Sequence, residues 1–193
     1  MERQSKTKEQ DRGKKRVLIT GSKGIIGNIL SKSLAQEFEI IQLDIQANPK
    51  ATNEFEADIS SQESLDAVFQ KIEKVDCIIH LAASSSHETP WEEVLKNNII
   101  GTRNVYEIAR KHGIRKVIFA SSTHLTAYEG YPQKSPLGRP IIPSDPPRPD
   151  SDYGISKGFG ENLARKYYDL YGIETICIRI GSVAKDDKPI EPY

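Results

Sequence analysis

Short apolar runs alternate along the chain with longer segments whose apolar residues recur every three or four positions. The short runs are rich in Val, Ile and Leu and predict six strands, at residues 17–19, 39–44, 55–57, 76–83, 116–122 and 173–180. The longer segments predict four helices, at residues 25–36, 61–72, 91–112 and 153–171. Only the connection from the second strand to the third lacks a helix. This alternation indicates an α/β fold with a doubly wound parallel six-stranded sheet, in the expected strand order 3-2-1-4-5-6.

Three glycines follow the first predicted strand. Gly21, Gly24 and Gly27 stand between that strand and the first helix. In such a motif the first glycine allows a tight turn, the second lets the backbone approach a pyrophosphate, and the third lets helix and strand pack closely. The N-terminus of the helix, at Ile25 and Ile26, then offers free N–H groups to the phosphates. A turn that only connects strand to helix is the alternative.

The second predicted strand ends in a carboxylate. Asp44 follows Gly27 by 17 residues, close to the offset of roughly 20 residues at which an acidic side chain reaches the ribose 2′-hydroxyl. A carboxylate there accepts hydrogen bonds from ribose hydroxyls and repels a 2′-phosphate. We therefore expect NAD, and not NADP, as the cofactor.

Two further strands end in residues suited to a cofactor. Asp58 and Ile59 follow the third strand, where the carboxylate is placed either to meet an adenine amino group or to begin the next helix. Leu81, Ala82 and Ala83 end the fourth strand, and small residues there leave space for a nicotinamide. Because ligands of doubly wound sheets bind beyond the carboxyl ends of the strands, all five are candidate cofactor-binding residues.

A tyrosine and a lysine stand four residues apart at the start of the last helix. Tyr153 and Lys157 therefore project from one helix face. A neighbouring ammonium favours the phenolate and lowers the pKa of a tyrosine toward neutrality, so the pair is a candidate general base. Ser122, at the end of the fifth strand, is placed to hydrogen-bond the oxygen that Tyr153 would deprotonate.

The composition suits one α/β domain with a hydrophobic core. The 193 residues include 27 basic and 27 acidic side chains and are 37% hydrophobic, which gives no reason to expect a nucleic-acid or membrane partner. We expect no metal site. No apolar run approaches the length of a membrane span, and the start of the chain lacks an apolar signal-peptide core, so a cytoplasmic location is expected. Cys77 and Cys177 lie in predicted strands and are expected to be buried core residues.

The chain divides into three parts. Residues 1–15 form an expected disordered basic tail, for which a nucleic-acid arm is a weaker alternative because no aromatic residues accompany the charges. Residues 16–183 form the expected Rossmann domain, and residues 184–193 begin a substrate-binding part that is otherwise missing. Within the domain, residues 128–150 hold seven of the eleven prolines and predict a stiff loop that acts as a lid or binding segment.

The combination of glycine turn, acidic strand end, serine, tyrosine and lysine resembles the extended short-chain dehydrogenase/reductase superfamily, which includes the NAD-dependent epimerase/dehydratase family. The likeness covers residues 16–183. It implies that Tyr153 is the catalytic base, Ser122 its hydroxyl partner and Lys157 the residue that binds ribose and lowers the pKa of the base. It also implies that Asn98 contacts the cofactor near the nicotinamide.

Four segments more closely resemble uronate dehydrogenase, at residues 119–124, 147–157, 158–164 and 178–182. That resemblance implies substrate contacts from His124, Thr123, Ser182 and one of Ser85 or Ser86, of which we choose Ser86. Thr123 departs from the family, whose members carry an asparagine there, and this leaves the identity of the substrate open. A loop histidine that caps the strand end is the alternative for His124.

The resemblance implies hydride transfer from the anomeric carbon of a hexuronic acid, or a related aldose such as a phosphorylated hexose, to NAD, giving a lactone. A nucleotide-sugar epimerase or dehydratase and a non-catalytic NAD-binding module are the alternatives. Superfamily members also pair their two long helices, here about residues 91–112 and 152–171, into a homodimer. We therefore expect a homodimer that acts on a small sugar.

Overall fold

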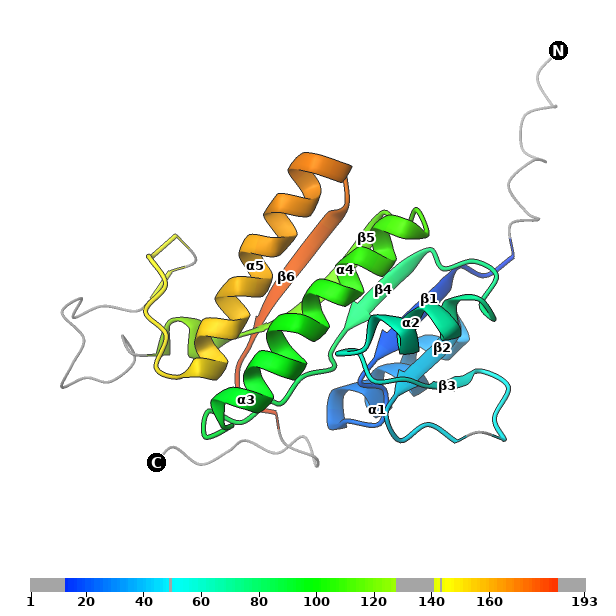
Figure 1. Cartoon of the computed structure of the whole chain (residues 1–193), viewed down its shortest axis with the longest axis horizontal. Coiled ribbons are helices and arrows are strands. Elements are labelled where there is room, and N and C mark those ends of the chain that lie inside the picture. The colour runs from blue at the N-terminus through cyan, green and yellow to red at the C-terminus, as the bar shows by residue number, and fades with distance from the viewer. Residues whose placement is uncertain (1–12, 49, 128–140, 143, 184–193) are drawn as a thin grey trace, which may run out of the picture.

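The computed structural model describes residues 13–48, 50–127, 141–142 and 144–183 (Figure 1). Most of the predicted tail and of the proline-rich loop, and all of residues 184–193, lie outside the described residues. Within the part of the chain that the structure describes, no helix is long and apolar enough to cross a membrane.

Six parallel strands form the sheet, in the order β3-β2-β1-β4-β5-β6. This confirms the predicted strand order and the doubly wound arrangement. The strand order reverses between β1 and β4, because the connection after β1 leads toward one edge of the sheet and the connection after β4 leads toward the other. Ligands of such folds bind in the crevice between these two connections. The strand bounds are β1 Arg16–Thr20, β2 Glu39–Asp44, β3 Glu54–Glu56, β4 Cys77–His80, β5 Lys116–Ser122 and β6 Glu174–Ile180.

Helices cover the two faces of the sheet unequally. One face carries α2 (Gln62–Phe69), α4 (Gly101–Lys111) and α5 (Asp152–Tyr171), which lie side by side across the sheet in Figure 1. The other face carries α1 (Ile25–Ser33) and the short 3₁₀ turn η1 (Leu34–Gln36). Alternate residues of β1 serve the two layers, since Leu18 joins the larger core cluster while Val17 and Ile19 join the smaller one.

The edge strand β6 is the least covered part of the sheet. Ile176 is 64% exposed and Ile178 is 48% exposed, on the face that α5 does not cover. Cys77 and Cys177 were expected to be buried, yet both are only partly buried. Each thiol still packs against a core cluster, and burial raises its pKa, to about 11 for Cys177. Both cysteines therefore behave as apolar residues of low reactivity.

The helix predicted over residues 91–112 begins and ends near its predicted bounds but is not one regular helix. It consists of α3 (Trp91–Glu93), a π-helical stretch η2 (Val94–Ile100) and α4, joined end to end. Stretches of this type are frequent at functional sites, and η2 carries two residues of the cavity described below. The predicted strand over residues 76–83 is also shorter, since β4 ends at His80. The N–H of Leu81 still donates to the carbonyl oxygen of Thr20 at the end of β1.

Two glycines allow α5 to lie close to the strand layer. A Cβ atom at Gly160 would come within 2.2 Å of the Phe119 ring in β5. A Cβ atom at Gly154 would come within 2.3 Å of the carbonyl oxygen of His124, in the 3₁₀ turn η3 (Thr123–Leu125). Neighbouring protein atoms thus account for these helix glycines, and the contacts bring the start of α5 against the end of β5.

Candidate active site

A cavity of about 830 Å³ opens at the carboxyl ends of the strands. Its wall combines the turn after β1, the ends of β2 and β5, the segments after β3, β4 and β6, and the first turns of α5. Every predicted site residue except Asn98 and Ser86 lines it. The predicted cofactor and substrate residues are therefore brought together from seven segments of the chain.

The turn after β1 is closed by backbone contacts that side chains would prevent. Gly21 has a φ of 70°, and a Cβ atom there would lie 2.7 Å from the backbone nitrogen of Ala82. A Cβ atom at Gly27 would lie 2.3 Å from the carbonyl oxygen of Gly21. Gly24 is exposed and precedes α1, whose N-terminus has no side-chain cap. This geometry is compatible with the predicted roles of the three glycines. The turn holds no side chain beyond Cα at these positions, so an anion could approach the free N–H groups at the start of α1.

Asp44 lies beside the glycine turn. Its Oδ2 atom accepts a hydrogen bond from the backbone N–H of Lys23 at 2.9 Å, and its Oδ1 atom accepts one from the N–H of Gln46 at 3.0 Å. The ammonium of Lys23 lies 2.6 Å from the Glu54 carboxylate and not against Asp44. Asp44 thus contributes a negative charge to the cavity wall that no side-chain cation neutralises among the contacts described, which suits ribose hydroxyls and opposes a 2′-phosphate.

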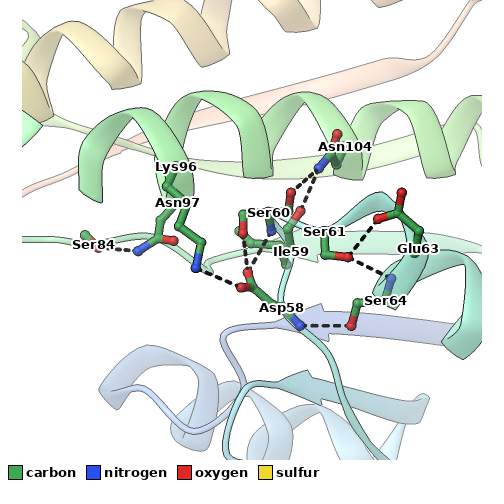
Figure 2. A network of polar contacts seen from close by, with 10 residues as sticks. All are labelled: Asp58, Ile59, Ser60, Ser61, Glu63, Ser64, Ser84, Lys96, Asn97 and Asn104. Carbon is green, nitrogen blue, oxygen red and sulfur yellow. Dashed lines mark hydrogen bonds and ion pairs between the residues drawn. The ribbon is translucent and has the colours of Figure 1, made fainter. Parts of the chain in front are cut away.

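Asp58 lines the cavity and precedes α2. Figure 2 shows its polar contacts. Its Oδ1 atom accepts hydrogen bonds from the N–H and the hydroxyl of Ser60, and its Oδ2 atom lies 3.0 Å from the ammonium of Lys96 in η2. Burial raises the pKa of Asp58, but these hydrogen bonds outweigh it and hold the pKa below its ordinary value. Asp58 therefore fits both interpretations of the sequence, since an ionised carboxylate lines the cavity and also orders the chain before α2.

The serine, tyrosine and lysine of the predicted catalytic group converge on one end of the cavity. Tyr153 and Lys157 are 7% and 5% exposed, and the ammonium of Lys157 lies 5.3 Å from the centre of the Tyr153 ring. Lys157 also donates to the carbonyl oxygen of Ala120 at 2.8 Å. Ser122 ends β5 beside the phenol.

The electrostatics of this group differ in one respect from the prediction. Burial raises the pKa of Tyr153, while a hydrogen bond with Ser122 lowers it by a smaller amount, so the net shift is upward and not toward neutrality. Burial lowers the pKa of Lys157 to about 8. The physical reason is that both side chains are buried, so desolvation dominates the pKa shift of each group. The ammonium of Lys157 donates to the carbonyl oxygen of Ala120.

His124 follows Ser122 at the mouth of the same region. Its Nδ1 atom lies 2.9 Å and 3.1 Å from the two carboxylate oxygens of Asp150, a residue that the sequence analysis did not select. Its ring stacks on His87 with 5.6 Å between ring centres and meets the Tyr153 ring edge-on at 5.6 Å. The His124 ring is therefore held by Asp150, His87 and Tyr153. A histidine that only capped the end of β5 would not need these contacts.

The other predicted substrate residues are divided between the cavity wall and its surroundings. Thr123 and Ser182 line the cavity, and the Thr123 hydroxyl donates to the carbonyl oxygen of Ile180 at 3.4 Å. Ser86 is exposed and its hydroxyl accepts a hydrogen bond from the N–H of Glu88 in a local turn. The preceding serines line the cavity instead, so Ser85 fits a substrate contact better than Ser86 does.

Asn98, which was predicted to contact the cofactor near the nicotinamide, does not line the cavity and supports its wall. It is 2% exposed, and its amide bonds both the N–H and the carbonyl oxygen of Ser84, at 2.9 Å and 3.0 Å. It also donates to the Ser156 hydroxyl at 3.0 Å, which links η2 to α5. The amide of its neighbour Asn97 donates to the Ser84 hydroxyl at 2.9 Å (Figure 2). Asn98 thus fixes the loop after β4, while Lys96 and Asn97 face the cavity.

Several wall residues were missed by sequence reasoning because nothing in their local pattern distinguishes them. They come from segments next to the predicted residues, and they include Ser84, Lys96, Asn97, Ala120 and Ser121. The π-helical turn that presents Lys96 and Asn97 has no sequence signature that we recognised. Asp150 carried a usable signal, since it stands three residues before Tyr153 in a segment already singled out.

The residues present fit a dinucleotide. The glycine turn would be filled by side chains at Gly21 and Gly27, the N-terminus of α1 lacks a cap, and Asp44 offers acceptor oxygens on the same wall. Among the described residues, no group of three or more His, Cys, Asp or Glu side chains gathers to hold a metal ion.

Comparison with known proteins identifies relatives over nearly all of the described chain. A family model described as NAD dependent epimerase/dehydratase family matches residues 17–184. The chain is 41% identical over 169 residues to a uronate dehydrogenase of Pseudomonas syringae pv. tomato, covering 86% of this chain and 59% of that protein. It is 32% identical over 189 residues to an NAD-dependent glucose-6-phosphate dehydrogenase of Haloferax volcanii, covering 91% of this chain and 71% of that protein.

Solved structures give the same picture. A crystal structure of uronate dehydrogenase from Agrobacterium tumefaciens superposes with a TM-score of 0.75 at 41% identity, covering 87% of this chain and 61% of that chain. A mutant of that enzyme complexed with NAD superposes with a TM-score of 0.72 at 39% identity, covering 84% of this chain and 59% of that chain. The chain thus spans about 60% of the length of the uronate dehydrogenases that it matches.

Proposed function

The chain belongs to the NAD-dependent epimerase/dehydratase family, and from this premise we propose that it is the cofactor-binding and catalytic part of an NAD-dependent sugar dehydrogenase. The glycine turn and the N-terminus of α1 hold the diphosphate, and Asp44 binds the adenosine ribose. Small residues after β4 leave room for the nicotinamide. Names of relatives that oxidise uronate and glucose 6-phosphate support a sugar as the substrate.

The proposed reaction oxidises the anomeric carbon of a hexuronic acid to a lactone. NAD supplies the hydride acceptor, C4 of the nicotinamide. Tyr153, as the phenolate, takes the proton of the anomeric hydroxyl, and Ser122 hydrogen-bonds the same oxygen. The hydride leaves carbon as the proton leaves oxygen, so a carbonyl forms.

Lys157 supports the base in spite of the unfavourable effect of burial. A buried phenol resists ionisation, so the phenolate requires a nearby positive charge. The Lys157 ammonium lies beside the Tyr153 ring and is the cation placed to supply it. With a pKa of about 8, Lys157 is protonated at neutral pH.

One observation carries the proposal: the glycine turn, Asp44, Ser122, Tyr153 and Lys157 all line one cavity. Hydride transfer to NAD requires a general base for the substrate hydroxyl and a binding site for the dinucleotide that lie in the same cavity. A module that only holds NAD could use Lys157 to bind ribose, but it has no use for a buried phenol paired with the Ser122 hydroxyl.

The test has two stages. Calorimetric titration with NAD measures binding, and NADH absorbance then measures turnover with galacturonate, glucuronate and glucose 6-phosphate. NADH formed with a uronate supports the proposal, and NADH formed only with glucose 6-phosphate changes the substrate to a phosphorylated hexose. A UDP-sugar product without net NADH identifies a nucleotide-sugar epimerase, and NAD binding without any product identifies a binding module.

We also propose that two copies of the chain associate through α4 and α5. These helices lie side by side (Figure 1), and the adjoining η2 and α5 carry exposed apolar side chains. Examples with their exposed fractions are Ile100 at 42%, Tyr168 at 53%, Leu170 at 62% and Tyr171 at 44%. Light scattering after size exclusion is expected to give twice the chain mass for the wild type and a monomer for Tyr168→Lys with Leu170→Lys. A wild-type monomer at micromolar concentration would contradict this assembly.

A cytoplasmic location completes the proposal. Both cysteines are free, and each packs in its own strand, which fits a reducing compartment. Cell fractionation tests this directly, and recovery outside the cytoplasmic fraction would overturn it.

A further inference from the structure

A nearly buried carboxylate lies beside the ring of His124. The side chain of Asp150 is 9% exposed, and its two oxygens lie 3.1 Å and 2.9 Å from Nδ1 of His124. The hydroxyl of Ser151 donates to Oδ1 of the same carboxylate at 2.9 Å. Removing a carboxylate from water is unfavourable unless its oxygens are hydrogen-bonded, so the imidazole is an important partner of Asp150.

Contacts from other segments fix the plane of the same ring. His87, from the loop before α3, stacks on His124 with an interplanar angle of 11°, and Tyr153 of α5 meets the ring at 70°. With Nδ1 directed to Asp150, Nε2 is the ring nitrogen left for a ligand in the cavity that His124 lines. The His124 side chain keeps 35% exposure, in contrast to the carboxylate behind it.

We propose that Asp150 is a positioning residue that holds the proton of His124 on Nδ1, so that Nε2 accepts a hydrogen bond from a hydroxyl group of the sugar. The tautomer of a neutral histidine is set by the hydrogen bond that the other ring nitrogen makes. A carboxylate only accepts, so it selects the ring form with a proton on Nδ1 and a lone pair on Nε2. The substrate part of this inference rests on the proposed function, whereas the state of the ring does not.

An accepting Nε2 atom on His124 favours a substrate that presents a hydroxyl group to it, such as a sugar, over a substrate that presents only hydrogen-bond acceptors there. Ser122 and Thr123 can each donate or accept, but Nε2 in this tautomer can only accept. The hydroxyl that meets Nε2 is thereby oriented with its hydrogen toward His124. Loss of Asp150 frees the ring to place its proton on Nε2, where it would donate and mismatch the same hydroxyl.

A purely structural role for Asp150 is the competing explanation. Asp150 adjoins the start of α5, where the Ser151 hydroxyl accepts a hydrogen bond from the N–H of Gly154 at 3.1 Å and caps the helix. The backbone N–H of Asp150 also reaches the carbonyl oxygen of His124 at 3.4 Å. The two roles are separable, because the positioning role depends on an Asp150 oxygen that accepts from Nδ1 of His124, whereas the helix cap depends on the Ser151 hydroxyl.

The experiment compares Asp150→Ala, Asp150→Asn and Ser151→Ala with the wild type. Nitrogen-15 NMR of the four histidines reports the protonated ring nitrogen, with His124 assigned by its loss in His124→Gln. Spectra are taken at a pH above which the ring signals no longer change. We expect an Nδ1-protonated ring in the wild type, in Asp150→Asn, which keeps an acceptor oxygen, and in Ser151→Ala. We expect a mixture that favours Nε2 protonation in Asp150→Ala.

Kinetics complete the test. In Asp150→Ala the KM for the sugar should rise about tenfold or more, since a buried hydrogen bond is lost, while the affinity for NAD should stay within about twofold. Asp150→Asn should recover most of the sugar affinity, and Ser151→Ala should change the urea midpoint without changing the KM. If Asp150→Ala does not fold, the spectra of the wild type and of Asp150→Asn still decide the tautomer.

The outcomes separate the two proposals. A wild-type ring protonated on Nε2, or a spectrum unchanged in Asp150→Ala, overturns the positioning role. A changed spectrum with an unchanged KM for the sugar overturns the contact with the substrate. A wild type that shows the expected ring but oxidises no sugar leaves the positioning of His124 intact and refutes the proposed function.

Discussion

The Oδ2 atom of Asp44 accepts a hydrogen bond from the N–H of Lys23, so the carboxylate at the end of β2 is fixed against the glycine turn after β1. This contact joins the two elements from which the cofactor was predicted. It also directs a charge toward the place where an adenosine ribose would lie in the proposed complex.

Replacing Asp44 should therefore change cofactor preference. Hydrogen bonds to a charged group contribute about 1.5–3 kcal/mol, so Asp44→Ala should weaken NAD binding by about 10- to 100-fold. Binding of NADP should strengthen, because the repulsion of its 2′-phosphate is removed. Calorimetric titration with both nucleotides measures the change. Glu39→Gln, at the other end of β2, is the matched control, and an unchanged ratio of NAD to NADP affinity in Asp44→Ala would contradict this role.

Tyr153→Phe should abolish turnover while sparing the cofactor. General base catalysis contributes about 10²- to 10⁴-fold, and the phenol is the group that faces both Ser122 and Lys157. The kcat for uronate oxidation should fall by at least about 10²-fold, with an NAD affinity within about threefold of the wild type. Tyr168→Phe, at an exposed tyrosine of the same helix, should leave the rate unchanged. Equal rates for wild type and Tyr153→Phe would require another base.

The sequence predicted those parts of the site whose residues lie close together in the chain, and it did not predict contacts between residues that lie far apart. The strand order follows from alternating elements and right-handed crossovers, and the glycines and Asp44 occur at a spacing that a motif defines. The strand order is confirmed, and the glycines and Asp44 lie at the cavity where the motif predicts them. The position of Asn98 behind the cavity wall could not be predicted, because its partners Ser84 and Ser156 lie 14 and 58 residues away and are brought together only by folding.

The same limit explains the tyrosine and lysine pair. Helix periodicity placed Tyr153 and Lys157 on one face correctly, but the upward shift of the Tyr153 pKa depends on burial in the folded chain, which outweighs the hydrogen bond with Ser122. The π-helical η2 and the pairing of Asp150 with His124 likewise arise from tertiary contacts. Sequence thus located the chemical groups, whereas their protonation states required the packed structure.

Lys157 should cost stability at neutral pH, and the cost should disappear in alkali. Burial lowers its pKa from 10.5 to about 8, so at pH 7 a buried ammonium is retained at a cost of up to about 3 kcal/mol. Between pH 8 and 10.5 the unfolded chain holds a proton that the folded chain has lost, so stability rises with pH in that window. Lys157→Met should therefore raise the free energy of unfolding at pH 7 and have little effect near pH 10.

Urea unfolding of the wild type and Lys157→Met at the two pH values measures this difference. The hydrogen bond from Lys157 to Ala120 offsets part of the expected gain. Lys166→Met, at an exposed lysine of α5, should show no such dependence on pH. A stability difference between wild type and Lys157→Met that is the same at both pH values would show that burial does not perturb this lysine.

Two alanine substitutions in the glycine turn should separate folding from cofactor binding. At Gly27 the new Cβ atom would meet backbone atoms, 2.3 Å from the Gly21 oxygen and 2.7 Å from the Ser22 Cα, so the turn must open. Overpacking of this kind costs about 1–3 kcal/mol, which exceeds the gain of about 1 kcal/mol in helix propensity. Gly27→Ala should thus lower the urea midpoint and weaken NAD binding together.

Gly24→Ala should behave differently. Its backbone angles, φ −66° and ψ 171°, suit alanine, and the nearest atom to the new Cβ would be the Gly21 oxygen at 3.3 Å. The free energy of unfolding should therefore stay within about 0.5 kcal/mol of the wild type, as for other exposed positions. NAD affinity should nevertheless fall about tenfold or more, because the methyl group occupies the space through which a diphosphate approaches the backbone. A Gly24→Ala chain that binds NAD as tightly as the wild type would show that the phosphates do not lie against this turn.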